Sequence, residues 1–195
     1  TYRTVTDFSS AGPSTTESGL SPNVAAPGVS IASAAVGTGN GAQIQSGTSM
    51  AAPHVAGVAA LTVQAHPGWT ASQIAAAVVG TADADGMAGY QVTQSGAGLV
   101  DALQAINTQT VVTGDSYRAE AGRVQEATLS FGFDEFAKTY RDTRTIAITN
   151  LSDRPVTYTL SSQASAQSRP ATVSLGDRRV TVRAHGQVRV PVRLS

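Results

Sequence analysis

A serine at the start of an uncharged, apolar segment is the residue of this sequence best placed to do chemistry. Ser49 follows Gly47 and Thr48 and precedes residues 50–65, which contain no Asp, Glu, Lys or Arg. This pattern predicts that a helix begins beside Ser49, where unpaired backbone N–H groups and the positive end of the helix dipole converge. An oxyanion formed beside Ser49 would be stabilised by the serine's own N–H. A plain N-cap role for Ser49 or Thr48 explains a bare serine–helix pattern more simply.

The full string around Ser49 carries more information than the helix start. Residues 46–57 read Ser-Gly-Thr-Ser-Met-Ala-Ala-Pro-His-Val-Ala-Gly, and they resemble the nucleophile motif of subtilisin-like serine proteases, the subtilase family. Residues 8–13 and 23–29 resemble the two segments that precede the nucleophile in that family, and residues 96–102 resemble its closing segment. Asn23 stands where the family commonly carries Asp, which we interpret as a local loop change with little catalytic meaning.

The resemblance implies an acyl-transfer reaction on a polypeptide substrate. Ser49 would be the nucleophile, with Gly47, Thr48 and Ser49 bordering the oxyanion hole and the substrate pocket. A histidine would take the serine's proton, and a buried aspartate would orient that histidine. Both motifs precede the serine in the family, yet neither an Asp-Thr/Ser-Gly nor a His-Gly-Thr sequence occurs in these 195 residues. No asparagine here matches the motif of the oxyanion-hole asparagine.

We therefore expect the missing groups to come from an upstream part of the same precursor, and this chain to be inactive alone. The first residue is Thr1, with no leader sequence before the domain, which fits a piece of a longer product. The resemblance also implies a secreted or cell-surface protein. Twelve Arg to one Lys indicates high-GC, bacterial codon usage.

The three histidines are poor substitutes for the missing base. His54 lies five residues after Ser49 on the same predicted helix and cannot easily turn back to it, so we interpret His54 as structural. Pro53 is expected in the first turn of that helix, where its missing N–H costs nothing. His66 precedes Pro67-Gly68 and could cap carbonyls at the helix end. His185 lies in a predicted turn and should be solvated.

Metal and cofactor sites are not predicted in this chain. Asp83 and Asp85 supply two oxygens of a calcium site at most, and solvated loop charges explain them more simply. Calcium remains a candidate for the missing part of the parent. The absence of cysteine excludes disulfides and thiolate metal sites. A net charge of zero gives no case for nucleic acid, and no run of 18 apolar residues exists that could span a membrane.

The composition changes near residues 107–115. Residues 1–107 carry a net charge of −4 and the alanine-rich runs, whereas residues 108–195 carry +4 and alternate apolar and polar residues. We expect residues 1–107 to be α/β, the C-terminal portion of a subtilase catalytic domain. Residues 108–115 would be a linker. Residues 116–195 would form an all-β immunoglobulin- or fibronectin-like sandwich, and they resemble, more weakly, the fibronectin-like domain of some large secreted subtilases.

Periodicity predicts the individual elements. The first helix, from Ser49 to about residue 65, is apolar nearly all round and should lie in the middle of a domain. A second helix should begin at Thr70, where Thr-Ala-Ser-Gln forms a capping box. A third, around residues 98–106, should present Leu99, Leu103 and Ile106 on one side. Strands are expected at residues 127–131, 143–149, 156–160, 171–175, 179–183 and 188–194. Pro191 suggests that the last of them lies at the edge of its sheet.

Two functional hypotheses stay open at this point. The first is a piece of a secreted serine endopeptidase, and the second is a non-catalytic binding or structural module derived from a subtilase. The intact motif around Ser49 favours the first for the parent protein. The missing base favours the second for this chain alone.

Overall fold

The computed structural model describes residues 3–13, 20–114, 116–119, 122–132, 139–164, 168 and 170–195. Its helices are α1 (Thr48–Ala65), α2 (Ala71–Gly80), α3 (Val92–Ser95) and α4 (Ala102–Asn107). Its strands are β1 (Ile31–Ala34), β2 (Ala42–Gln45), β3 (Thr110–Thr113), β4 (Ser116–Ala119), β5 (Gly122–Gln125), β6 (Asp142–Asn150), β7 (Val156–Thr159), β8 (Val173–Leu175), β9 (Arg179–Val182) and β10 (Gln187–Leu194).

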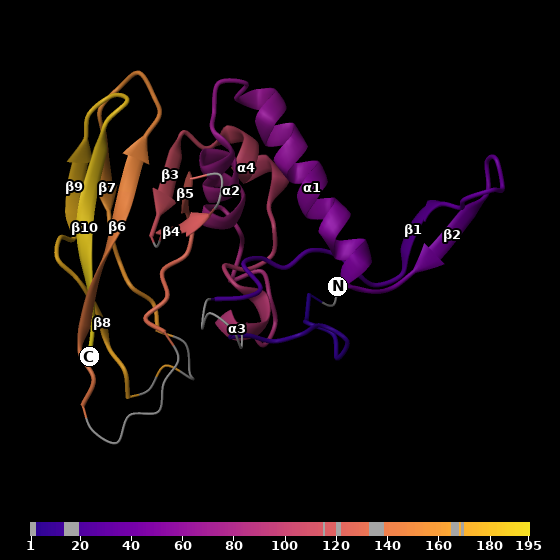
Figure 1. The fold of residues 1–195 in the computed structure, drawn as a ribbon, viewed down its shortest axis with the longest axis horizontal. Coiled ribbons are helices and arrows are strands. Elements are labelled where there is room, and N and C mark those ends of the chain that lie inside the picture. Colours follow the sequence, from indigo (N-terminus) through magenta and orange to yellow (C-terminus); the bar gives the residue numbers. More distant parts are fainter. Residues whose placement is uncertain are drawn as a thin grey trace.

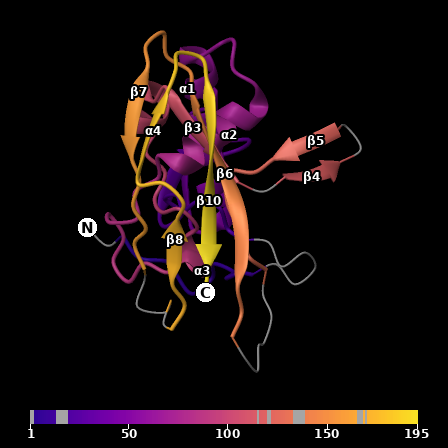
Figure 2. The same ribbon diagram turned by 90° about the vertical axis from the view of Figure 1, so that its left-hand side faces the viewer.

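These elements form a mixed α/β region followed by a β-rich region. In Figure 1 the β-rich sheets lie at the left, α2 and α4 in the centre, α1 to their right, and the β1–β2 hairpin projects beyond α1. Figure 2 shows that the β4–β5 hairpin extends from the side of the body. None of the helices in the described part of the chain is long and apolar enough to cross a bilayer.

Helix α1 forms where the sequence predicts it, but it is covered on one side only. Val58 and Thr62 are buried, and Val58 packs against Val78 of α2 and Ala105 of α4, whereas Leu61 and Val63 are 48% and 51% exposed. The expectation that this helix lies in the middle of a domain is therefore not met within the described residues. A helix without charged residues is typical of one that is buried on all sides, whereas α2 and α4 bury α1 on one side only.

Helix α2 begins at the predicted capping box. The Gln73 N–H donates to the Thr70 hydroxyl at 3.3 Å, and the Thr70 N–H donates to Gln73 Oε1 at 2.7 Å. The two otherwise unpaired N–H groups are thus satisfied reciprocally. The side chains of Ile74, Ala76, Ala77 and Val78 are buried. Their burial makes α2 the most enclosed helix of the α/β region.

The third predicted helix starts later than expected. Asp101 is the N-cap of α4, and its carboxylate accepts the Gln104 N–H at 2.9 Å. Leu99 lies before the helix, in isolated β-bridges to Ala25 and Asp83. Leu103 is 66% exposed, and Ala105 is the residue that packs inward. The expected face of Leu99, Leu103 and Ile106 is wrong because the aspartate cap sets the helix start.

Two antiparallel sheets enclose the core of the β-rich region. A four-stranded sheet has the order β3-β6-β10-β8, and β7 pairs with β9 in a second sheet. Ile148, Val180, Val182 and Val190 form a buried cluster contributed by β6, β9 and β10. The strands predicted at residues 143–149, 156–160, 179–183 and 188–194 are confirmed, and that at 171–175 is confirmed for β8 alone.

Two strand predictions are wrong. Residues 127–131 form no strand, and β5 ends before them. The alternation of apolar and polar residues is not an alternation of burial here, since Ala127 contacts a core cluster and its polar neighbour Thr128 is buried as well. Pro191 does not mark an edge strand, because β10 lies between β6 and β8. The proline is tolerated since the β8 ladder covers only Val192–Leu194.

The expected linker overlaps a strand of the main sheet. Residues 108–115 include β3, which pairs with β6 from Thr110 to Thr113. Asp115 lies outside the described residues. Val111 of β3 packs against Ala76 and Ala77 of α2, so the two regions share a buried cluster. The division at 107–115 remains a prediction.

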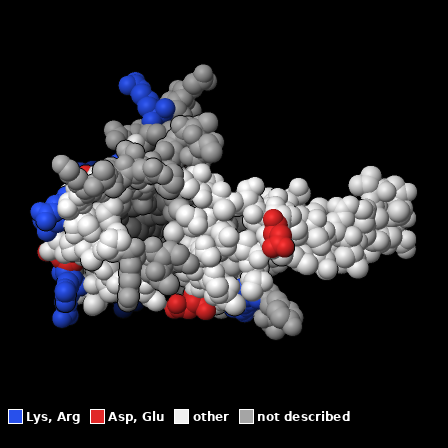
Figure 3. Space-filling model, turned by 90° about the horizontal axis from the view of Figure 1, so that it is seen from below, with Lys and Arg blue, Asp and Glu red and all other residues white. Residues whose placement is uncertain are grey.

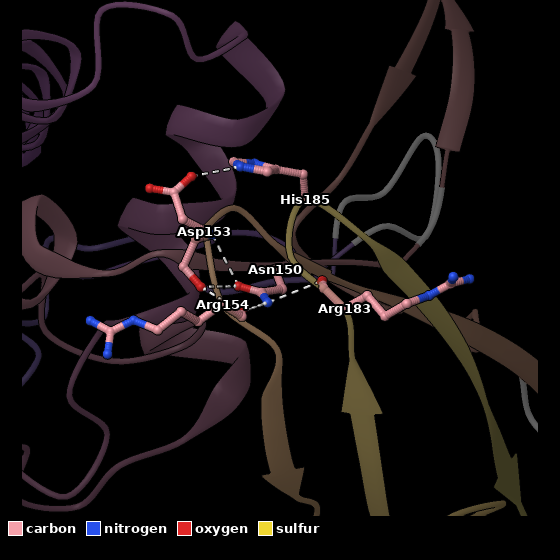
Figure 4. A network of polar contacts seen from close by, with 6 residues as sticks. Asn150, Asp153, Arg154, Arg183 and His185 are labelled. Carbon is pink, nitrogen blue, oxygen red and sulfur yellow. Dashed lines mark hydrogen bonds and ion pairs between the residues drawn. The ribbon is translucent and has the colours of Figure 1, made fainter.

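A buried asparagine joins the turns at one end of the two sheets (Figure 4). The Asn150 amide group donates to the carbonyls of Arg154 at 2.7 Å, Val182 at 3.2 Å and Arg183 at 3.1 Å. Its carbonyl oxygen accepts the N–H and the hydroxyl of Ser152 at 3.0 and 2.7 Å. Asn150 is completely buried. One side chain thus satisfies the polar groups of two connections that are distant in sequence.

Asn150→Ala should lower the free energy of unfolding by about 3 kcal/mol, because several buried backbone groups lose their partner at once. Urea unfolding followed by circular dichroism measures the change. Ser152→Ala is the control and should cost about 1 kcal/mol, because the Ser152 N–H still donates to Asn150. Equal losses for the two variants would contradict the central position of Asn150.

Candidate active site

The N-terminal turn of α1 begins at Gly47, which lies close to Gly28 of an earlier segment. Gly47 is the N-cap of α1, with φ 156° and ψ 164°, a region that essentially only glycine occupies. Its N–H donates to the Gly28 carbonyl at 2.8 Å. A Cβ built on Gly28 would lie 2.8 Å from the Gly47 carbonyl oxygen and 3.3 Å from the Ala51 Cβ. The start of α1 is therefore fixed against the segment around Gly28.

Ser49 lies exposed in the first turn of α1. Neither Ser49 nor Thr48 is the N-cap, so the simple capping interpretation is wrong for both residues. The first hydrogen bond of the helix joins the Met50 N–H to the Gly47 carbonyl at 3.0 Å. The N–H groups of Thr48 and Ser49 precede that bond and point out of the helix end, as the first N–H groups of any helix do.

This arrangement suits a nucleophile and the charge that it creates. The Ser49 hydroxyl is at the surface, and its own N–H is not engaged by an earlier turn of helix. The partial positive charge of the N-terminus adds to that N–H. Both the Ser49 N–H and the partial positive charge of the helix N-terminus would stabilise a tetrahedral oxyanion formed beside Ser49.

A largely apolar cavity of about 620 Å³ lies beside this helix start. Most of its lining residues lie within 3–9, within 22–29 and in the first turns of α1, including Gly47, Thr48 and Ala51. Ser49 is not part of its lining. The cavity thus meets the N-terminal turn of α1 on the side of Gly47 and Thr48.

Residues 23–29 and 96–102, which resemble family segments before and after the nucleophile motif, are hydrogen-bonded to each other. The Val100 N–H donates to the Ala25 carbonyl at 2.8 Å, and the Ala25 N–H donates to the Gly98 carbonyl at 2.8 Å. The Tyr90 hydroxyl donates to the Gly96 carbonyl at 2.7 Å, and burial raises the pKa of this phenol. The Asn23 amide donates locally to the Leu20 carbonyl at 3.2 Å. Residues 23–29 and 96–102 are therefore brought together.

His54 is held by its own helix. Its Nδ1 lies 2.8 Å from the Met50 carbonyl oxygen, one turn earlier. Because a carbonyl only accepts, Nδ1 donates. Pro53 lies in the second turn of α1, not in the first as predicted, so it donates no N–H to the Ser49 carbonyl. The geometry gives His54 a local structural contact.

The other two histidines are engaged elsewhere. His66 Nε2 donates to the Ile106 carbonyl at 3.0 Å, so it caps a carbonyl of α4 instead of one of its own helix. His185 is exposed and lies 2.8 Å from Asp153, as Figure 4 shows.

Asp83 and Asp85, considered above as half a calcium site, have different surroundings. Asp83 accepts the Gly86 N–H at 2.8 Å and lies 3.9 Å from Arg3, while Asp85 is exposed. Among the residues that the structure describes, no group of three or more His, Cys, Asp or Glu side chains could hold a metal ion.

Sequence reasoning missed Gly28 and Ser46 as parts of this site. Ser46 Oγ accepts the Ser30 N–H at 2.8 Å, which fixes the chain just before α1. Both residues stand inside the quoted motifs. The one local signal at Gly28 is the Pro-Gly pair, which indicates a turn.

Comparisons with known proteins agree with this reading of the N-terminal region. The family model described as "Subtilase family" matches residues 1–132. The minor extracellular protease Vpr of Bacillus subtilis is 39% identical over 122 residues, covering 58% of this chain and 15% of that protein. The subtilisin-like protease SBT3.11 of Arabidopsis thaliana is 47% identical over 83 residues, covering 40% and 11%. The CO(2)-response secreted protease of Arabidopsis thaliana is 38% identical over 128 residues, covering 60% and 15%. The chain thus spans less than a fifth of the length of these curated relatives.

Gly28→Ala should lower the free energy of unfolding by about 1–3 kcal/mol, because the new methyl group would overlap the Gly47 carbonyl. Thermal and urea unfolding measure the loss. Gly57→Ala, in the open middle of α1, is the matched control and should be neutral or stabilising by up to about 1 kcal/mol. A neutral Gly28→Ala would show that the contact of Gly28 with Gly47 does not constrain the helix start.

Proposed function

The chain belongs to the subtilase family, and from this membership we propose that it is the nucleophile-bearing part of a subtilisin-like serine endopeptidase. The observation that carries the proposal is the position of Ser49. It lies exposed in the first turn of a long uncharged helix, with its N–H ahead of the first helical hydrogen bond. Subtilases act on polypeptides in general, and the peptide bond is the substrate class proposed here.

Ser49 Oγ would attack the carbonyl carbon of the peptide bond. The proton of the hydroxyl passes to a histidine, and the oxyanion is stabilised by the Ser49 N–H and the helix end. When the C–N bond breaks, the leaving amine takes that proton and an acyl-enzyme ester remains on Ser49. Water then hydrolyses the ester. Gly47 and Thr48 would border the pocket that holds the substrate beside the apolar cavity.

The histidine of this mechanism, its aspartate and the oxyanion-hole asparagine are proposed to come from an upstream part of the same precursor. The contacts of the three histidines in this chain support that assignment. His54, His66 and His185 contact Met50, Ile106 and Asp153. A serine hydroxyl without a base is a poor nucleophile at neutral pH. In subtilisin itself, removal of the histidine alone lowers kcat by about 2 × 10⁶, a value measured for that enzyme.

We further propose that the parent protein is secreted, and bacterial as its arginine usage suggests. Its relatives include proteases whose names describe them as extracellular or secreted. The β-rich region is proposed to be an immunoglobulin- or fibronectin-like sandwich, which two facing antiparallel sheets support.

A fluorophosphonate probe tests the proposed role of Ser49, because it labels only an activated serine. The isolated chain should neither label nor hydrolyse peptides, whereas the full-length precursor should do both. Ser49→Ala in the precursor should abolish both activities. His54→Ala is the matched control on the same helix and should keep the labelling while lowering stability by about 1 kcal/mol.

Two results would overturn parts of the proposal. Labelling of the isolated chain at Ser49 would show that a base lies within it. A folded precursor that does not label would favour the second hypothesis, a non-catalytic module derived from a subtilase.

A further inference from the structure

Helix α2 is a layer shared by the two regions of the chain. On one side, Val78 packs with Val58 of α1 and Ala105 of α4. On the other, Ala76 and Ala77 pack against Val111 of β3. Both alanines are completely buried, which lets the α2 backbone lie close to the sheet. The α/β region and the β-rich region thus share an apolar core where they meet.

His66 joins the C-terminal ends of two helices of the α/β region. It is the C-cap of α1, and its backbone N–H donates to the Thr62 carbonyl at 2.9 Å. Its ring Nε2 donates to the Ile106 carbonyl of α4 at 3.0 Å. The ring also stacks on Trp69, with centroids 3.8 Å apart and planes at 7°. His66 therefore contacts α1, α4 and the indole ring at the same time.

Trp69 continues this path into the β-rich region. It packs against the cluster of Ala76, Ala77 and Val111, together with Leu151. The Leu151 N–H donates to the Gln109 carbonyl at 2.8 Å, which ties the end of β6 to the residue before β3. A continuous set of contacts thus leads from the β-rich sheet through Trp69 and His66 to the end of α1.

We propose that His66 and Trp69 are positioning residues that couple the β-rich region to α1, the helix that carries Ser49. Trp69 packs against the cluster that contains Val111 of the sheet, and its indole stacks on the His66 ring. His66 in turn caps the C-terminal end of α1. Hydrogen bonds join the successive turns of α1, and Pro53 removes the one to the Ser49 carbonyl. Fixing the C-terminal end of α1 therefore also restricts the direction in which its first turn points. The effect on catalysis rests on the proposed function, whereas the coupling itself does not.

Hydrogen exchange of the 195-residue chain, measured by mass spectrometry, tests the coupling. His66→Phe keeps an aromatic ring beside Trp69 but removes the N–H donor to Ile106. Val111→Ala removes two methyl groups from the β-rich side of the junction. Each should raise the exchange rate of α1 amides roughly tenfold.

Two controls separate this path from general destabilisation. Val182→Ala makes the same deletion at an equally buried position in the cluster between the two sheets. It should accelerate exchange in β7 and β9 and leave α1 unchanged. Leu103→Ala changes an exposed residue of α4 and should leave every region unchanged. The fluorescence of Trp69, the single tryptophan, reports whether each variant keeps its native environment.

The proposal is overturned if α1 exchange is the same as in the wild-type chain for His66→Phe and Val111→Ala. It is also overturned if Val182→Ala accelerates α1 as much as Val111→Ala does, because the chain would then open as a whole. A variant whose Trp69 fluorescence is that of the unfolded chain is replaced by Trp69→Phe, which keeps a smaller ring and should give the same α1 response. Circular dichroism checks the fold of Trp69→Phe, because this variant lacks the single tryptophan.

Activity of the full-length precursor gives a second, distinguishable readout. His66→Phe should lower kcat roughly tenfold and change KM much less, because Ser49 loses alignment while most of the cavity lining lies outside α1. Equal changes in kcat and KM would contradict a positioning role. A wild-type precursor without peptidase activity would refute the proposed function, and the exchange experiment would still decide the coupling.

Discussion

The packing of α2 between two unlike partners is the interaction on which the rest of this structure depends. Without α2, the buried stripe of α1 around Val58 would face solvent, and so would Val111 on the outer face of β3. The helix can serve both sides because its sequence places Val78 toward α1 and small alanines toward the sheet. Its start is fixed by the reciprocal hydrogen bonds of Thr70 and Gln73. A short capping sequence thus determines where two larger regions meet.

The sequence allowed the elements with strong local signals to be predicted. The uncharged run after Ser49, the capping box at Thr70 and the alternation of residues 188–194 each depend on neighbours within a few positions, and each is confirmed. Predictions failed where a distant contact decided the outcome. Residues 127–131 alternate like a strand, but such alternation does not show whether a hydrogen-bonding partner exists, and here the buried residue is Thr128 of the polar set. Pro191 suggested an edge because the short extent of β8 cannot be read from β10 itself.

In the candidate site, too, the local features could be predicted and the contacts between distant segments could not. The motif around Ser49 allowed the helix start to be predicted, because a glycine followed by an apolar run is a local pattern. The assignment of His54 to a structural role followed from its spacing on the helix, and its contact with Met50 agrees with that role. The contact between Gly28 and Gly47 could not be predicted, since it joins segments from different parts of the chain. Neither could the path from His66 to Trp69 and Leu151, which exists only once β3 lies on α2.

The β1–β2 hairpin has a consequence for how such a chain is made. Within the described residues its two strands pair only with each other, and Val36 and Ile44 are 100% and 68% exposed. The sequence between Glu17 and Asp83 contains no charged residue, and the projecting arm at the right of Figure 3 shows neither blue nor red atoms. Lysine, proline and bulges are the usual features that prevent open strand edges from joining other chains. A nascent polypeptide that exposes this hairpin lacks those protective features, so its open edges can pair with another chain until its own chain or a chaperone shields them.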